Sequence, residues 1–440
     1  MADTDKNKAP LAHHDETLPS VEVSSTGRPL TRNWIKVIAF IWCGQAVSIL
    51  TSYAALFAVI WYIVSVTGGS VTTLATVSTL TLLPIGFISP FAGVLADRVN
   101  RRLIMIVADA GVGVVSVALA LIIMLGSPSL TLVVGVLILR SCGQAFHAPA
   151  MTAAMPMLVP ARHLLRINTL SQMLWSFAGI FAPAVGIFIY INLGLEFALL
   201  LDALGAAVAV AGMVLARIPT VRDKTISSRR VVSNMADGLR VISKNRGLML
   251  LIVLCTIDMI LFTPISTLFP LMTYSHFGPA FGNDEEVLGY LASLIEAVFG
   301  IVILAGSLIL ILWGGGRRHT LIVINCGLGI GVTTLVMGLL APGQFWVFLG
   351  ASGVMAAFCA FYNGPVTTIL QRHSPNEKTG RVMGVYSSMV TLAPALGLLP
   401  AALIAEPFGI ANWFLLSGIL MVALVVPAYF LRSIRGLDKS

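Results

Sequence analysis

Five ionisable side chains lie inside long apolar stretches of this 440-residue chain. They are Asp109, Arg140, Asp202, Asp258 and Glu296. A charge near the centre of a bilayer costs roughly 2.5–3.5 kcal/mol on insertion scales, so each of these side chains needs a partner or a function. Two chemistries suit them: one charge can neutralise another, or a carboxyl can bind and release a proton or a charged solute.

Asp258 and Glu296 fall near the middle of two neighbouring apolar stretches, in a half of the chain that has no cation inside such a stretch. Burial and mutual repulsion both favour the protonated form of at least one of the two carboxyls. An antiporter needs a carboxyl that loads and releases a proton as water access changes sides. We therefore predict that Glu296 first, and Asp258 second, couple transport to protons; the alternative is an ordinary polar contact.

The three remaining charges suggest an ion pair. At about 1.5 Å per helical residue, Asp109 lies roughly 10 Å inside its stretch and Arg140 lies near the middle. Because a flexible arginine can bridge that gap, we predict an Asp109–Arg140 pair, which either only neutralises two charges or takes part in coupling or substrate binding. The nearby basic loop is an alternative partner for Asp109. Asp202 is expected near the outer face, in water. His147 could titrate, but a lone histidine beside a proline is more often a structural hydrogen-bond donor.

Twelve apolar spans must position these side chains. They cover residues 34–64, 71–95, 103–125, 130–152, 167–191, 196–216, 248–273, 287–312, 319–340, 344–369, 381–405 and 410–431. Their lengths match those of helices that cross a bilayer. The fold class that we predict is therefore an all-α polytopic membrane protein.

Lysine and arginine occur in alternate connections between these spans. Of the 27 basic residues only Arg140 lies deep within a span, and six connections contain none: 68–70, 126–129, 192–195, 274–286, 341–343 and 406–409. Basic residues mark the cytoplasmic side of a membrane protein. We therefore expect both termini and the long middle loop in the cytoplasm.

Composition excludes several classes of function. Hydrophobic residues make up 57% and charged residues 10% of the chain, and its mean hydropathy is +0.94. A pI near 9.4 then indicates contact with anionic lipid, and no nucleic-acid partner is expected. The five cysteines stand singly within spans, so we expect neither disulfides nor a metal site.

Motif searches argue against a membrane-embedded enzyme and against ATP hydrolysis. No HExxH is present and no lysine follows a glycine, so the chain has no GxxxxGK[ST] phosphate loop. No cofactor is expected, and an ion gradient must then drive any uphill transport.

The second half of the chain repeats the first. Residues 146–149 match 361–365, Arg101-Arg102 matches Arg317-Arg318 at an offset of 216, and 182–186 matches 393–397 at an offset of 211. Six spans repeated in tandem predict two bundles related by an axis along the membrane normal, with a substrate site between them.

This repeat defines the domain organisation that we expect. It comprises a cytoplasmic tail (1–33), a six-helix bundle (34–216), a linker with an amphipathic helix (217–247), a second six-helix bundle (248–432) and a short cytoplasmic tail (433–440).

The connection between the second and third spans contains Gly93, followed by Asp97-Arg98 and then Arg101-Arg102. It resembles the signature loop of the major facilitator superfamily, except that Asn100 stands where a glycine is usual. The resemblance implies two six-helix bundles that rock against each other. It also implies a gating role for this loop, in which contacts of Asp97 favour the state that is closed to the cytoplasm. Arg166 and Arg381, at equivalent positions of the repeat, are the candidate partners.

Two further motifs are similar to those of the superfamily. The stretch that begins at Arg140 and includes Gly143 is similar to its buried-arginine motif. Gly179, Pro183 and Gly186 are similar to the glycine-proline motif associated with antiporters, with alanine before the proline.

Stretches 43–48, 145–150 and 412–418 look like the macrolide-efflux branch of the superfamily. This resemblance implies a proton-coupled exporter of a small amphipathic substrate in a bacterial inner membrane, functional as a monomer. Export of an endogenous metabolite such as a siderophore, or uptake, remains an alternative.

Overall fold

The computed structural model describes residues 34–126, 128–215, 228–313, 318–375 and 378–438. Within these ranges the description does not extend to the side chains at 90, 93–94, 96–98, 153, 156–157, 161–166, 168–173, 176, 228–235, 311, 313 and 379–380.

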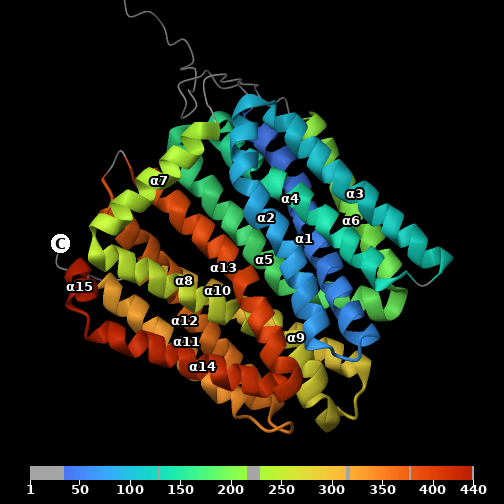
Figure 1. Cartoon of the computed structure of the whole chain (residues 1–440). Helices are drawn as coiled ribbons and strands as arrows, with labels where there is room; N and C mark the ends of the chain where they lie inside the picture. The colour runs from blue at the N-terminus through green and yellow to red at the C-terminus, as the bar shows by residue number, and fades with distance from the viewer. Residues whose placement is uncertain (1–33, 127, 216–227, 314–317, 376–377, 439–440) are drawn as a thin grey trace, which may run out of the picture.

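Long helices account for nearly all of the described chain (Figure 1). Twelve of them are α1 (Trp34–Val66), α2 (Val71–Arg98), α3 (Arg101–Leu125), α4 (Leu130–Leu158), α5 (Ala161–Leu193), α6 (Leu195–Leu215), α8 (Arg246–Thr267), α10 (Glu285–Trp313), α11 (His319–Gly338), α12 (Phe345–Arg372), α13 (Thr379–Phe408) and α14 (Ile410–Val425). Eleven are long and apolar enough to cross a membrane, and α5 adds the shorter apolar stretch Phe177–Leu193. The prediction of twelve membrane helices is confirmed.

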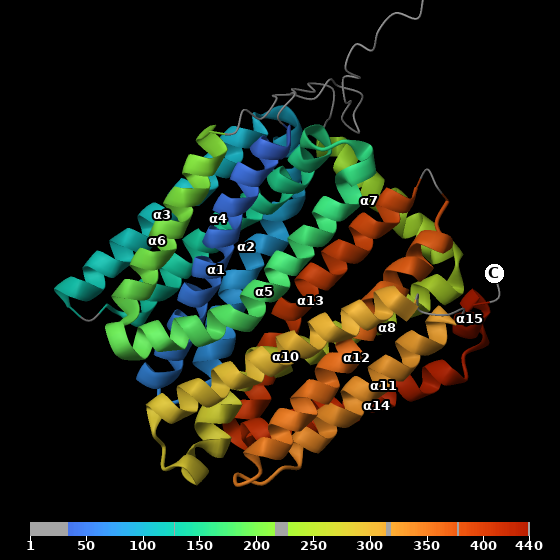
Figure 2. The ribbon, with the colours of Figure 1, turned by 180° about the vertical axis from the view of Figure 1, so that it is seen from behind.

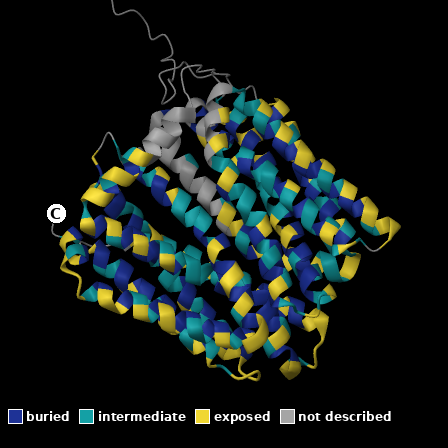
Figure 3. Ribbon diagram, in the orientation of Figure 1, coloured by how far each residue is buried: buried dark blue, intermediate teal, exposed yellow. Residues whose placement is uncertain are grey.

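The helices form two bundles, α1–α6 (the N-bundle) and α8–α14 (the C-bundle), which lie side by side in both views (Figures 1 and 2). In the N-bundle α1 packs on α5 and α6, and α4 packs on α2 and α3. Side chains that face the interior of each bundle are buried, whereas the outer faces are exposed (Figure 3). An apolar exterior of this kind suits contact with lipid.

Polar side chains start several helices at the chain's turns. Ser70, Ser129 and Asn245 accept backbone N–H groups in the first turns of α2, α4 and α8. Asn100 does the same for α3, accepting from the N–H of Arg102 at 3.0 Å. The asparagine that replaces a glycine in the loop motif therefore has a structural role as an N-cap.

The segment between the bundles contains helix α7 (Ser228–Lys244), which packs on α13 and α8. Gly238 lies so close to the backbone carbonyl of Arg381 that a side chain there would clash with it. The end of the molecule near α7 also carries the start of α1 and of α3, and we call it the Arg102 end. The opposite end carries the connection 67–70 and is called the Ser70 end.

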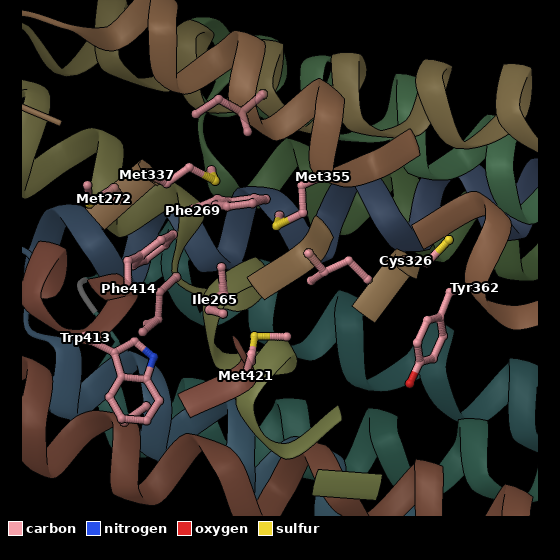
Figure 4. Close-up of a cluster of buried hydrophobic side chains, with 14 of the residues drawn as sticks. Ile265, Phe269, Met272, Cys326, Met337, Met355, Tyr362, Trp413, Phe414 and Met421 are labelled. Atoms are coloured by element: carbon pink, nitrogen blue, oxygen red, sulfur yellow. The ribbon is translucent and has the colours of Figure 1, made fainter. Parts of the chain in front are cut away.

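The seventh membrane helix differs from the predicted span 248–273. It ends at Thr267, and the chain continues through α9 (Phe269–Leu271), a π-helical turn (Met272–Phe277) and a 3₁₀ turn (Gly278–Phe281). The break directs Phe269 into the core of the C-bundle, beside Phe414 (Figure 4). Its ring centre lies 5.9 Å from that of Phe348 and 6.2 Å from that of Phe414. Aromatic packing thus stabilises a bend that hydropathy does not reveal.

The bundles meet closely at the Ser70 end. Glu406 of α13 accepts hydrogen bonds from the Thr72 backbone N–H (2.7 Å) and the Ser70 hydroxyl (3.3 Å), so it caps α2 of the other bundle. The rings of Trp61 and Tyr274 pack edge to face with centres 6.1 Å apart. These contacts join α1 and α2 to the C-bundle at one end of the molecule.

Two glycines at equivalent positions of the repeat let helices touch within each bundle. Gly186 of α5 packs on the carbonyl of Ala54 in α1, and Gly397 of α13 packs on the carbonyl of Ile260 in α8. A methyl group at either position would overlap that carbonyl oxygen. The motif repeated at an offset of 211 therefore reflects the same helix contact in the two bundles. By contrast, nothing lies within 4 Å of the Cβ position of Gly179.

We predict that Gly186→Ala and Gly397→Ala each lower the thermal stability of the purified protein, because forcing a methyl group into close packing costs roughly 1–3 kcal/mol. Gly179→Ala is the matched control: the site is open, and alanine favours a helix by about 1 kcal/mol. Melting curves in detergent measure the effect. Equal melting temperatures for all three variants would contradict the packing role.

Candidate functional site

Six polar side chains that are buried or partly buried in the N-bundle form two layers. Three of its helices each contribute one side chain to each layer, seven residues apart: Gln45 and Ser52 on α1, Asp109 and Ser116 on α3, and Arg140 and His147 on α4. A spacing of seven keeps both members on one helical face, and it separates the layers by about 10 Å along the helix. The pattern aims polar groups from three helices at a common axis.

The layer nearer the Ser70 end is built around Asp202 of α6. Arg140 forms an ion pair with this carboxylate and also donates to the hydroxyl of Ser116. The carboxylate accepts two further hydrogen bonds, from Ser52 at 2.5 Å and from Ser116 at 2.6 Å. Asp202 is fully buried and Arg140 nearly so. A buried pair with this many hydrogen bonds meets the conditions under which such a pair is tolerated.

The layer nearer the Arg102 end is built around Asp109. Its Oδ2 atom accepts a hydrogen bond from the side-chain amide of Gln45 at 3.1 Å and lies 3.5 Å from Nε2 of His147. Asp109 and His147 retain 10% and 12% of their side-chain exposure. This layer is therefore less enclosed than the layer around Asp202.

Two expectations about these charges are wrong. Arg140 pairs with Asp202, not with Asp109. Arg140 lies 18 residues, about 27 Å, from the end of α4 at Leu158, whereas Asp109 lies about 12 Å along α3 from the same face, so an arginine cannot reach it. Asp202 is not a solvated residue near the outer face, because α6 turns it into the bundle, where it has no exposed surface. His147, treated as a lone residue, lies against Asp109.

The buried carboxyl of the C-bundle, Asp258, has no cationic partner in the described chain. Asp258 of α8 has no exposed surface, and neither of its oxygens makes a hydrogen bond of normal geometry within the described chain. The described groups that interact with it are Tyr362 and Cys359 of α12, Tyr386 of α13 and Cys255 of α8. The phenol oxygen of Tyr362 is likewise buried without a hydrogen-bond partner. Because none of these neighbours is a cation, the surroundings favour a neutral carboxyl.

Glu296 lies on the face of α10 that contacts the N-bundle. Gly289 and Gly300, seven residues before it and four after it, share this face. Gly289 packs against Ile187 of α5 and Trp61 of α1, and Gly300 packs against Ile180 of α5. The side chain of Glu296 is partly buried, and it forms no hydrogen bond or ion pair with the described chain. Its carboxyl is thus at the interface of the bundles. Glu296 is not among the groups that face Asp258, so the expected mutual repulsion is not seen.

Comparisons with known proteins agree with this architecture. Residues 41–315 and 279–439 match the model of the Major Facilitator Superfamily. The chain belongs to the major facilitator superfamily. It is 33% identical over 407 residues to Macrolide efflux protein A of Streptococcus pyogenes, covering 92% of this chain and 98% of that protein. It is also 25% identical to the Multidrug efflux pump Tap of Mycobacterium tuberculosis, over 84% of this chain and 87% of the pump.

Solved structures show the same superfamily fold. A crystal structure of a POT family transporter in complex with 5-aminolevulinic acid aligns with a TM-score of 0.70 at 12% identity, covering 89% of this chain and 95% of that one. The chain is therefore a multi-pass membrane transporter, and within the superfamily it resembles the macrolide-efflux branch, as its motifs indicate.

The superfamily's loop motif joins α2 to α3. Arg102 donates to the backbone carbonyls of Met213 (2.9 Å) and Val214 (2.6 Å), so it caps the last turn of α6. Arg101 begins α3, whereas the side chains of Gly93, Asp97 and Arg98 lie outside the description.

Arg381, expected as a candidate partner of Asp97, forms an ion pair with Asp237 of α7 at 2.7 Å. Arg166 lies outside the described side chains. The gating contact of Asp97 stays a prediction, and the structure adds α7 as a further site that binds Arg381.

An apolar cavity of about 520 Å³ lies between α2, α3 and α4. Its walls include Leu95, Val107, Leu139 and Phe146, and Gly111, which has no neighbour within 4 Å of its Cβ position, leaves part of it open. The sequence gives no signal for this cavity, because its lining residues are ordinary apolar residues of a membrane span.

We predict that Arg140→Met and Asp202→Leu each destabilise the transporter by about 3–5 kcal/mol, because each leaves a buried group without its partner. The double variant Arg140→Met/Asp202→Leu recovers much of that loss, since two apolar side chains leave no charge behind. Melting temperatures of the wild type, the single variants and the double variant form a cycle that measures the coupling. Strictly additive losses would contradict the ion pair.

Proposed function

We propose that this transporter exports amphipathic drugs of the macrolide type by alternating access, in exchange for protons. The observation that carries the proposal is the 33% identity to a macrolide efflux protein over 92% of the chain. The similarity to a multidrug efflux pump points the same way. The superfamily's members are transporters, so an enzymatic activity is not proposed.

The distribution of basic residues supports an orientation for this exporter. Basic residues gather at the Arg102 end, including Arg101, Arg102, Arg240, Arg372 and Arg381. By the positive-inside rule that end faces the cytoplasm, together with both termini. In this orientation the contacts of Glu406, Trp61 and Tyr274 join the bundles on the outer side.

The carboxyls of the C-bundle are the proposed coupling sites. Glu296 lies between two contact points of α10 with the N-bundle, so rocking of the bundles changes its surroundings directly. Asp258 is enclosed by uncharged groups, which favours a bound proton. One proton moving through 100 mV supplies about 2.3 kcal/mol, and a tenfold gradient requires about 1.4 kcal/mol. One proton per cycle therefore sustains a drug gradient of roughly forty-fold.

We predict that Glu296→Gln and Asp258→Asn abolish proton-driven export while leaving protein abundance near the wild-type level. Each removes a titratable group and keeps its shape. Glu286→Gln is the matched control, because Glu286 is an exposed carboxyl in the first turn of the same helix, α10. Macrolide susceptibility of a pump-deficient bacterial host measures export in cells, and drug movement into proteoliposomes under an imposed pH difference measures coupling.

Two outcomes would count against the proposal. Wild-type protein that moves no macrolide or other lipophilic drug under a pH difference would remove the drug-exporter function. Full activity of both Glu296→Gln and Asp258→Asn would keep the exporter and remove the C-bundle carboxyls from its coupling.

A further inference from the structure

We infer that Asp109 and His147 form a proton-binding site in the N-bundle, separate from the carboxyls of the C-bundle. The inference rests on the proposed proton-driven export and adds a second titratable site to it. The two side chains come from neighbouring helices, α3 and α4, and face each other with Nε2 of His147 3.5 Å from Oδ2 of Asp109.

Asp109 and His147 face each other without a formed hydrogen bond. A distance of 3.5 Å is too long for a well-formed hydrogen bond, and Nε2 of His147 has no hydrogen-bond partner within the described chain although the atom is buried. A proton added to the imidazole turns Nε2 into a charged donor that faces a carboxylate oxygen. Charge-assisted bonds of this kind are shorter and stronger than neutral ones. The structure therefore holds a place for a proton between the two side chains.

The surroundings distinguish this pair from the neighbouring layer. Asp202 is neutralised by an arginine, which stays charged at any physiological pH. The described groups that act on Asp109 are Gln45, which is neutral, the paired Asp202 and the imidazole of His147. An imidazole, unlike a guanidinium, can gain and lose a proton. The layer around Asp202 is thus permanently neutralised, whereas the charge of the layer around Asp109 depends on one proton.

Few charged or titratable groups lie near His147 in the described chain. Asp109 faces it from α3, and α1 contributes Gln45, which binds the same carboxylate oxygen. Arg140, one layer away on α4 itself, is paired with Asp202 of α6. Among the described side chains of α2 and α5 the one titratable group is Tyr190, which contacts Ser65 near the Ser70 end. The charge balance at this site is therefore set by Asp109 and His147.

Access and mobility are also suited to proton exchange. Both side chains retain about a tenth of their exposure, although Nε2 of His147 is itself buried, so water contacts the edge of the pair. Pro149 follows His147 by two residues in α4. Its missing N–H leaves out the hydrogen bond to the carbonyl of Ala145 and loosens the helix at this turn. A small movement of α4 can then close or open the gap between imidazole and carboxylate.

The first test is a nuclear magnetic resonance titration of purified protein with labelled histidine side chains. The chain has seven histidines, and the signal missing from His147→Gln assigns His147. We expect this signal to show a protonation step, Asp109→Asn to displace that step, and Asp258→Asn to leave it in place. A His147 signal that shows no protonation step, or one that Asp109→Asn does not affect, would overturn the inference.

The second test is the pH profile of drug transport in proteoliposomes. His147→Gln should bind drug with wild-type affinity but lose one pH transition of the transport rate. His276→Gln, on the far side of the molecule near the Ser70 end, is the control and should keep the profile. An unchanged profile in His147→Gln would overturn the coupling role. Failure of the wild type to respond to a pH gradient would instead remove the proposed function on which this inference rests.

Discussion

An ionised side chain surrounded by lipid and apolar helices must be paired, and this constraint organises both halves of the transporter. In the N-bundle, Asp202 has Arg140 and two serine hydroxyls, and Asp109 has an amide and an imidazole. In the C-bundle, Asp258 has only uncharged neighbours and Glu296 forms no ion pair with the described chain. A permanent cation thus neutralises Asp202, and we propose that protons neutralise the carboxyls of the C-bundle.

The two bundles are packed around the same helix contact. Equivalent glycines, Gly186 and Gly397, bring equivalent helices into backbone contact, so each bundle is closely packed around the same crossing. Between the bundles, α2 packs on α13 and α5 packs on α10, and a helix cap from Glu406 and an aromatic pair add contacts at the Ser70 end. Gly289 and Gly300 bring α10 close to α1 and α5. The rocking that alternating access requires must therefore shift these helix contacts as well as break the cap.

Much of the fold could be predicted from the sequence, because span length, basic connections and the repeat report directly on the membrane. The partners of the buried charges could not. Counting residues gives depth along a helix but not the rotation of that helix about its axis. The rotation decides that Asp202 faces Arg140 and that His147 faces Asp109. The spacing of seven between Gln45 and Ser52, Asp109 and Ser116, and Arg140 and His147 was a signal that could have revealed the two layers.

The central claim is that Asp258 is neutral in the resting protein because it has no cation to pair with. Infrared spectra of the protein in lipid at neutral pH test this most directly, since a protonated carboxyl has its own carbonyl stretching band. The account predicts that this band loses intensity in Asp258→Asn and keeps it in Glu286→Gln, which alters an exposed carboxyl. A band that Asp258→Asn leaves unchanged would mean that Asp258 is ionised, and would contradict the account.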